Sequence, residues 1–324
     1  MELITNQDII AGYLTDASNT HGHADALLRP RDTQEVVEIV RMAQRYNIPI
    51  TVTAQRTSTT GGPVPNGGWL LSTERLNTIH SDTQVDGGVI LGAYQSYLER
   101  KGFLFPPDPT SRNECSIGAC VSCNASGARS FRYGSTRPWI ERIEVVFPNG
   151  DVRIVDRETP IPEHWPAIRW NEPNVKTSAG YSPTNNLLDL MIGQEGTLGI
   201  ITKVWTKLIA LPNEVLGMIV YFSNLEDCLS CVEELRVGAV RPNQEGRLGA
   251  LSPRAIEFFD ARSILLMRSR VDVPEQANCG LFLEVEHDDD LDLDPWFDVF
   301  ERHNALCDDI IAAENDEELS LIHI

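Results

Sequence analysis

Three cysteines lie close together near the middle of the chain, at Cys115, Cys120 and Cys123. Their C-x4-C-x2-C spacing fits the plant-type 2Fe–2S pattern, which requires a fourth thiolate. Four further cysteines could supply that thiolate: Cys228, Cys231, Cys279 and Cys307. The alternative is that the three act as small buried hydrophobic residues, a common use of free cysteine.

Two segments rich in small residues could contact phosphate. Residues 55–62 read Gln-Arg-Thr-Ser-Thr-Thr-Gly-Gly and lie between two predicted strands. Such a loop can present successive backbone N–H groups to a diphosphate, and Arg56 adds a charged donor; the alternative is a flexible surface turn. Residues 193–201 form a glycine-punctuated turn before a strand, which by itself predicts only close backbone packing. The chain has no Walker loop, G-x-G-x-x-G or G-x-S-x-G motif.

No metal site is predicted. His21 and His23 have the spacing of a ligand pair, but no third ligand is evident beside them, so solvated histidines are the alternative. The run Asp288–Asp290 lacks the ligand alternation and the glycine of a calcium loop.

The formal net charge of −20 is concentrated near the C-terminus. Residues 281–318 hold 15 acidic residues and one basic residue, whereas residues 101–142 carry a net charge of +3. The acidic excess argues against nucleic-acid partners and against docking on an anionic membrane surface. The basic island at 101–142 indicates a local anionic ligand, with scattered surface charge as the alternative.

A cytoplasmic location is expected, and peripheral attachment to a membrane stays open. The first 20 residues lack the basic start and apolar run of a signal peptide. No stretch approaches the roughly 20 consecutive apolar residues of a membrane helix. Seven cysteines in such a chain indicate reduced thiols.

A length of 324 residues predicts two domains. In the first, Asp32 and Glu35 form a capping box at the start of a helix over 32–46. The further predictions for this domain are strands at 48–52, 69–72, 89–91 and 200–209, a helix over 94–101, a long functional loop at 105–137, and a hairpin of 143–147 with 152–155 around Asn149-Gly150.

The second domain is predicted to begin after Leu211-Pro212. Its expected elements are strands at 215–222 and 281–286, helices over 225–237 and 295–312, and an apolar segment at 256–259. Residues 319–324 are apolar without periodicity and match a translated sequencing adapter, so we expect the natural reading frame to be interrupted near Glu318. The predicted domains are therefore 1–212, a partial domain at 213–318 and a non-native tail at 319–324.

Several motifs together resemble a flavoprotein family. The motifs are Asp16-Ala17-Ser18, the loop ending in Gly61-Gly62, Pro106-Pro107-Asp108-Pro109, Asn124-Ala125-Ser126-Gly127, Arg132-Tyr133-Gly134, and the run from Gly193 to Thr202. They resemble FAD-linked oxidases with the vanillyl-alcohol-oxidase (PCMH) type of FAD-binding domain, closest to the D-lactate dehydrogenase and glycolate oxidase branch. The resemblance implies an α+β fold: a two-subdomain FAD-binding domain followed by a partial ferredoxin-like substrate or cap domain.

The resemblance also implies a noncovalent FAD, since no histidine occurs in the first loop or in residues 105–137. Its pyrophosphate is expected between residues 56–62 and 116–118, and its isoalloxazine against residues 132–134. The implied cofactor-binding residues are Gln55, Arg56, Thr57, Ser58, Thr60, Gly61, Gly62, Pro107, Asp108, Ser116, Ile117, Gly118, Cys123, Asn124, Gly127, Tyr133, Gly134, Glu195, Gly196 and Ile200. The family's first loop usually has more glycines, and Arg56 could offset the lost N–H access by its charge.

The implied reaction is oxidation of a small D-2-hydroxy acid, such as D-lactate or glycolate, by hydride transfer to flavin N5, followed by electron transfer to an unknown acceptor. Family substrate groups lie largely toward the C-terminus, so no catalytic residue is predicted, and Arg132 is the single substrate-side candidate. The alternatives are a flavin-binding fragment without turnover and an ether-lipid (alkylglycerone-phosphate) synthase-like transferase. The sequence predicts no oligomeric state.

Overall fold

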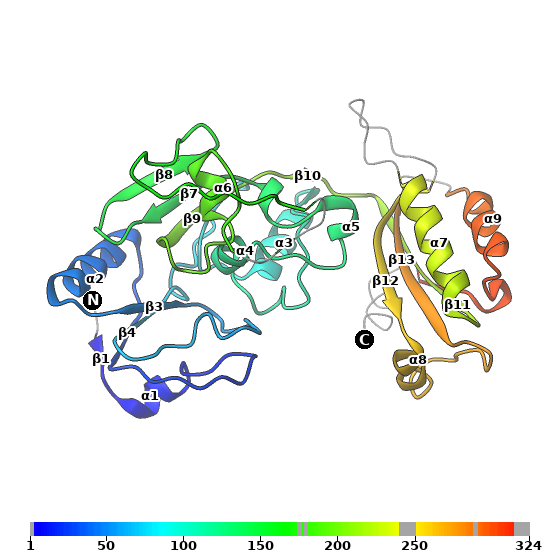
Figure 1. Ribbon diagram of the computed structural model, residues 1–324, viewed down its shortest axis with the longest axis horizontal. Coiled ribbons are helices and arrows are strands. Elements are labelled where there is room, and N and C mark those ends of the chain that lie inside the picture. The colour runs from blue at the N-terminus through cyan, green and yellow to red at the C-terminus, as the bar shows by residue number, and fades with distance from the viewer. Residues whose placement is uncertain (1–2, 174–176, 178–179, 240–250, 288–290, 314–324) are drawn as a thin grey trace. The chain divides into compact units, whose positions relative to one another are not determined.

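The computed structural model describes residues 3–173, 177, 180–239, 251–287 and 291–313, and it divides into two compact units (Figure 1). The first unit comprises residues 1–127 and 135–210, and the second comprises residues 128–134 and 211–324. No feature of the sequence indicated that 128–134 belongs with the second unit. The predicted acidic loop at Asp288–Asp290 and the predicted tail at 319–324 lie outside the described residues.

The first unit contains most of the secondary structure. Its elements are β1 (Leu3–Ile4), α1 (Gln7–Ala11), β2 (Ala26–Leu28), α2 (Thr33–Tyr46), β3 (Ile50–Thr53), β4 (Trp69–Ser72), β5 (Gln84–Asp86), α3 (Leu91–Glu99), β6 (Phe103–Leu104), α4 (Ile117–Cys123), the 3-10 turn η1 (Arg137–Trp139), β7 (Ile140–Val146), β8 (Val152–Asp156), α6 (Leu187–Met191), β9 (Ile200–Thr206) and β10 (Ile209–Ala210).

Two sheets build this unit. In the first, β2, β4 and β3 are parallel and β1 closes one edge antiparallel, in the order β1-β2-β4-β3. Helix α2 buries its apolar face on this sheet, while Leu27 and Leu70 pack on the opposite face with Ile10 of α1. The second sheet is antiparallel, in the order β5-β9-β7-β8, and its core is shared with α3, α4 and α6. Strands β6 and β10 form a separate pair.

The Asp32 N-cap of α2 and the β7–β8 hairpin are confirmed, whereas the predicted reciprocal bond of the capping box is seen one residue earlier, at Arg31. Asp32 caps α2 by accepting from the Glu35 amide at 2.8 Å, and the Glu35 carboxylate accepts from the Arg31 amide at 2.9 Å. The hairpin turns at Gly150, whose φ of +80° suits a residue without a Cβ.

Other predicted elements of the first unit were wrong in their bounds or type. Residues 89–91 are not a strand, because the strand of this region is β5 and α3 already begins at Leu91. Residues 105–137 are mostly loop, as predicted, but they also contain α4 and the short helix α5 (Ser130–Tyr133). The predicted strand at 200–209 is divided into β9 and β10.

The second unit is a four-stranded antiparallel sheet with helices on both faces. Its elements are α5 (Ser130–Tyr133), β11 (Glu214–Phe222), α7 (Leu225–Gly238), β12 (Pro253–Phe259), α8 (Ala261–Met267), β13 (Cys279–His287), α9 (Asp294–Arg302), the 3-10 turn η2 (Cys307–Asp309) and β14 (Ile311–Ala313). The strand order β12-β13-β11-β14, with α7 and α9 as the connecting helices, is the ferredoxin-like βαββαβ arrangement, and α8 is an addition to it.

Alternate residues of β11 face opposite cores of this unit. Met218 and Val220 pack beneath α7 and α9, whereas Ile219 and Tyr221 pack beneath α8. The helix predicted over 295–312 was wrong, because it ends at Arg302 and the chain continues as η2 and β14. Among the described residues, none of the helices has the length and apolar character needed to cross a membrane.

Candidate functional site

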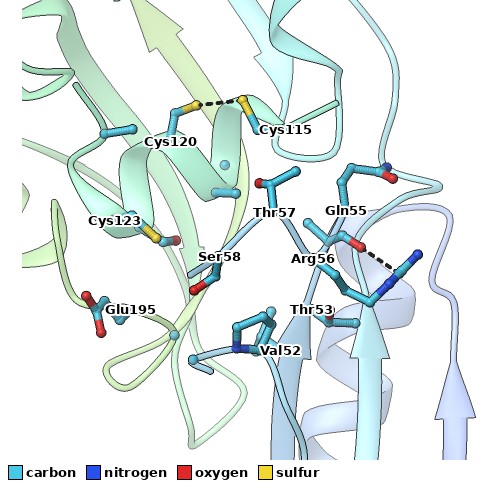
Figure 2. Close-up of a pocket in the computed structure, with 18 of the residues that line it drawn as sticks. Val52, Thr53, Gln55, Arg56, Thr57, Ser58, Cys115, Cys120, Cys123 and Glu195 are labelled. Carbon is cyan, nitrogen blue, oxygen red and sulfur yellow. Dashed lines mark hydrogen bonds between the residues drawn. The ribbon is translucent and has the colours of Figure 1, made fainter. Parts of the chain in front are cut away.

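A cavity of about 340 Å³ lies in the first unit. Figure 2 shows its two main sides: Thr57 and Ser58 come from the loop after β3, and Cys115, Cys120 and Cys123 come from the region of α4. Small residues dominate the lining, so much of the wall is backbone. The lining residues are Val52, Thr53, Ala54, Gln55, Arg56, Thr57, Ser58, Thr59, Thr60, Gly62, Pro63, Thr73, Pro109, Ser111, Cys115, Gly118, Ala119, Cys120, Ser122, Cys123, Ala125, Ser126, Glu195, Gly196, Gly199 and Ile201.

The loop at 54–63 is held in place by a buried carboxylate. Asp16 is 7% exposed, and its Oδ2 accepts from the Gly61 amide at 3.0 Å. Next to it, the Ala17 amide donates to the Arg56 carbonyl at 3.2 Å. The segment around Asp16 therefore fixes both ends of the loop, which explains why Asp16-Ala17-Ser18 belongs with the loop motif.

The same loop presents backbone donors that have no protein acceptor. Within the described part of the chain, the N–H groups of Thr57, Ser58, Thr59 and Gly62 make no hydrogen bond. Successive unpaired N–H groups form a concave anion-binding surface. The Thr53 hydroxyl, at the end of β3, is also buried without a partner among the described residues. This wall can therefore bind anionic oxygens mainly through neutral donors.

Arg56 has a structural role that the sequence did not indicate. Its φ of +60° is in the left-handed region, where glycine is the usual residue. The guanidinium lies 4.6 Å from the centre of the Tyr13 ring and donates to the Ala54 carbonyl at 3.1 Å. The prediction that Arg56 offers its charge to a pyrophosphate is thus not supported by these contacts, although the residue does line the cavity.

The opposite wall depends on close approach of backbones at two glycines. Gly118, in the first turn of α4, donates its N–H to the Gly87 carbonyl at 2.7 Å, and a Cβ at Gly118 would lie 2.6 Å from that oxygen. A Cβ at Gly127 would lie 1.6 Å from the Asp108 carbonyl oxygen. Since no real Cβ fits at either distance, both positions require glycine for the wall to form.

The glycine-punctuated turn at 193–199 forms the third side. Gln194 is 1% exposed and fixes the turn, because its side chain accepts from the Leu198 amide at 2.7 Å and donates to the Gly199 carbonyl at 3.1 Å. Glu195 and Gly196 both have positive φ, and both line the cavity. The turn therefore delivers backbone to the site, as close packing predicted, and also a carboxylate.

The predicted cofactor residues divide into two groups. Those that line the cavity are Gln55, Arg56, Thr57, Ser58, Thr60, Gly62, Gly118, Cys123, Glu195 and Gly196. Those outside its lining are Gly61, Pro107, Asp108, Ser116, Ile117, Asn124, Gly127, Tyr133, Gly134 and Ile200. Several of the second group support the wall, as Asp108 and Gly127 do. Sequence reasoning missed several lining residues, among them Thr53, Thr59 and Ser111. The end of a predicted strand was a signal for Thr53.

Arg132, Tyr133 and Gly134 belong to the second unit. Arg132 forms an ion pair with Glu286 at 2.7 Å, and the Tyr133 hydroxyl donates to the same carboxylate at 2.6 Å. Burial, together with the charge of Glu286, raises the pKa of Tyr133. Arg132, the predicted substrate-side residue, therefore has its guanidinium in an ion pair with Glu286 of β13.

The basic side chains of the island at 101–142 do not line the cavity, although other residues of the same segment do. Five of its six basic residues form ion pairs instead: Lys101 with Asp82, Arg112 with Asp108, Arg132 with Glu286, Arg137 with Asp189, and Arg142 with Glu141. The expectation that these charges serve a local anionic ligand is therefore not supported by the structure.

The cysteines do not assemble into a cluster site. Cys115 and Cys120 are buried with their sulfurs 3.5 Å apart, whereas Cys123 is exposed. The described residues contain no group of three or more His, Cys, Asp or Glu side chains arranged to hold a metal ion. Cys228 and Cys231 are fully buried in the core beneath α7. The arrangement leaves the iron–sulfur alternative without structural support.

Residues 24–156 match the FAD binding domain family. This segment carries the loop after β3 and the α4 wall of the cavity. Residues 24–156 therefore belong to that family, and FAD is the cofactor of the domain.

Relatives of known name extend the match beyond the FAD-binding domain. D-lactate dehydrogenase of Anaerostipes hadrus is 30% identical over 272 residues, which cover 81% of this chain and 51% of the relative. Glycolate oxidase subunit GlcD of Bacillus subtilis is 28% identical over 269 residues, which cover 80% and 51%. The chain therefore spans about half the length of the curated relatives it matches.

A solved structure shares the fold at low sequence identity. Alkyldihydroxyacetonephosphate synthase superposes with a TM-score of 0.70 at 18% identity, over 94% of this chain and 61% of the other. The two-part α+β fold expected from the motifs is confirmed by this similarity together with the match to the FAD binding domain family.

Proposed function

We propose that this chain binds FAD noncovalently in the cavity between the loop at 54–63 and α4. The observation that carries the proposal is the row of unpaired N–H groups at Thr57, Ser58, Thr59 and Gly62, which suits the oxygens of a pyrophosphate. The small residues of α4 leave room for the cofactor, and Thr53 adds a buried hydroxyl. No histidine lines the described cavity, which agrees with a noncovalent complex.

We further propose that the protein acts on a small D-2-hydroxy acid. The support is the similarity to proteins named D-lactate dehydrogenase and glycolate oxidase subunit. When bound, FAD would supply the acceptor for the hydride of the substrate's carbinol carbon. The chain's own contribution that the described residues support is to bind and orient the cofactor, and we assign no residue to substrate proton transfer.

The test is reconstitution of the purified chain with FAD, followed by anaerobic addition of D-lactate, glycolate or D-2-hydroxyglutarate. Retention of a visible flavin band after gel filtration is expected, and bleaching of that band by one of the acids identifies the substrate. A chain that retains no flavin would contradict the binding proposal. Retention without bleaching by any of the acids would favour a flavin-binding role without turnover.

Substitution of Gly62 tests the location of the cofactor. A Cβ at Gly62 meets no heavy atom within 4 Å, so Gly62→Ala should leave the fold intact and place a methyl group in the cavity wall. We expect weaker FAD binding at unchanged stability. Gly12→Ala is the matched control, because Gly12 has a negative φ of −67°, a Cβ there would make only an ordinary contact with the Ile9 carbonyl oxygen at 3.7 Å, and Gly12 does not line the cavity. Equal FAD affinity of Gly62→Ala and the unmodified chain would argue against this cavity as the site.

A further inference from the structure

Cys115 and Cys120 form a close pair of thiols within the cavity wall. Their sulfurs are 3.5 Å apart, and the two residues are 3% and 2% exposed. Both line the cavity, where Figure 2 draws the contact between them as a dashed line. A disulfide requires sulfurs about 2.05 Å apart. Closing the pair therefore needs the sulfurs to approach by roughly a further 1.5 Å.

We propose that Cys115 and Cys120 are a redox-active pair that closes to a disulfide and thereby weakens FAD binding. The inference rests on the proposed function, because it concerns regulation of the same cavity. Formation of the disulfide itself needs no flavin, so it can be tested separately from cofactor binding.

The two thiols have different chemical roles in this step. The hydrogen bond from Cys120 lowers the pKa of Cys115, whereas the same hydrogen bond raises the pKa of Cys120. With hydrogen peroxide as the oxidant, the Cys115 thiolate attacks one oxygen and releases hydroxide, forming a sulfenic acid. The Cys120 thiol then displaces the sulfenic oxygen as water, and the S–S bond forms. Two thiols are oxidised and one peroxide is reduced to two molecules of water.

A second thiol pair provides a control within the same chain. Cys228 and Cys279 are hydrogen-bonded to each other in the core of the second unit. Burial raises the pKa of both thiols, and neither lines the cavity. Because the thiolate is the reactive form, this pair should resist peroxide under conditions that oxidise Cys115 and Cys120.

The position of the pair explains why closure affects cofactor binding. Cys115 accepts from the Leu91 amide through its carbonyl at 3.0 Å and precedes the N-cap of α4, while Cys120 is within α4. Drawing the sulfurs together moves the wall that contains Gly118 and Ala119 relative to the loop at 54–63. By linkage, any loss of FAD affinity on oxidation equals the stabilisation of the dithiol by bound FAD. A tenfold loss corresponds to a shift of about 30 mV in the potential of the pair.

The experiment treats the full chain with hydrogen peroxide, with and without FAD, and maps disulfide-linked peptides by mass spectrometry. We expect a Cys115–Cys120 link that forms more slowly with FAD bound, an intact Cys228–Cys279 thiol pair, and an oxidised chain that binds FAD about tenfold more weakly. Dithiothreitol should restore the affinity. This reversal uses the unmodified chain, so it does not depend on whether the serine variants fold. Cys115→Ser and Cys120→Ser, where they fold, should each abolish the peroxide-induced loss of FAD affinity.

Two outcomes would overturn the inference. One is a chain that binds FAD but gives no Cys115–Cys120 link, and the other is a link that leaves FAD affinity unchanged. Failure of the reduced chain to bind any FAD would instead contradict the proposed function, and the peptide map would still report on the thiol pair.

Discussion

Replacing Arg56 by glycine and, separately, by alanine tests the strain in the loop at 54–63. The Arg56 backbone has φ of +60°, while its guanidinium lies over the Tyr13 ring. Both variants lose the stacked guanidinium, so this contribution cancels in their comparison. The remaining difference between them comes from the backbone, because alanine keeps the unfavourable conformation and glycine relieves it.

The size of that difference follows from two opposing terms. The left-handed region costs a non-glycine residue about 1–2 kcal/mol. Glycine has more freedom in the unfolded chain, which takes back about 0.4–1 kcal/mol. Arg56→Gly should therefore be more stable than Arg56→Ala by about 1 kcal/mol, opposite to the order of the two residues in helices. For a unit of about 200 residues this is a difference of about 2–4 °C in Tm.

Thermal unfolding followed by tryptophan fluorescence measures this difference, since five of the six tryptophans lie in the first unit. Gly102→Ala calibrates the backbone cost, because Gly102 has φ of +80° and open space around a Cβ. If Gly102→Ala is destabilised but Arg56→Ala is as stable as Arg56→Gly, the loop does not hold Arg56 in the left-handed region and the reasoning is refuted. Arg56→Gly should also keep FAD affinity within about tenfold, or 1.4 kcal/mol, because the guanidinium is already engaged with Tyr13.

Three further substitutions have expected outcomes. Gly118→Ala should lose about 1–3 kcal/mol of stability through overpacking against the Gly87 carbonyl, measured as a lower Tm; an unchanged Tm would mean that α4 does not approach so closely. Tyr221→Phe should raise the free energy of unfolding by about 1 kcal/mol, seen as a higher urea midpoint, because the fully buried Tyr221 hydroxyl has no partner among the described residues. The same burial raises the pKa of Tyr221 to about 12. A loss of stability would reveal a partner. For Glu144, burial raises the pKa, but hydrogen bonds from Lys203 and two threonines outweigh burial and lower the pKa overall. The contribution of Glu144 to the free energy of unfolding is therefore full above its unfolded pKa of about 4.3. That contribution is lost as the pH falls through the lower pKa of the folded state. The advantage of the unmodified chain over Glu144→Gln should therefore shrink in acid unfolding curves below that pH, and a constant difference would contradict the sign of the shift.

The elements that the sequence predicted well have strong local signals. Helix α2 has a capping residue, an apolar face with helical spacing and Asn47 in the left-handed region at its end. The β7–β8 hairpin has Asn149-Gly150 between β-branched runs. Where local chemistry and the final packing agree, the pattern is sufficient to locate the element.

The elements that were missed lack such signals or depend on distant partners. Helix α4 consists largely of small residues with weak helical preference, and it is fixed by the Ser116 cap and by contact with Gly87. The end of α9 had one usable signal, because Asn304 has φ of +54° and asparagine is frequent at helix ends. The placement of α5 depends on Glu286, which is more than 150 residues away in the sequence. No local pattern could have predicted that pairing.

The cavity combines a loop of mixed sequence with a backbone geometry that only some residues permit. On the α4 side, Gly118 and Gly127 are required because a Cβ would overlap backbone oxygens. On the loop side, Arg56 adopts a conformation suited to glycine, and the contacts with Tyr13 and Ala17 offset the cost. The unpaired N–H groups of the loop depend on its path and not on its side chains. A loop with few glycines can therefore keep the same binding surface, provided that neighbouring segments hold the one residue that takes glycine's place.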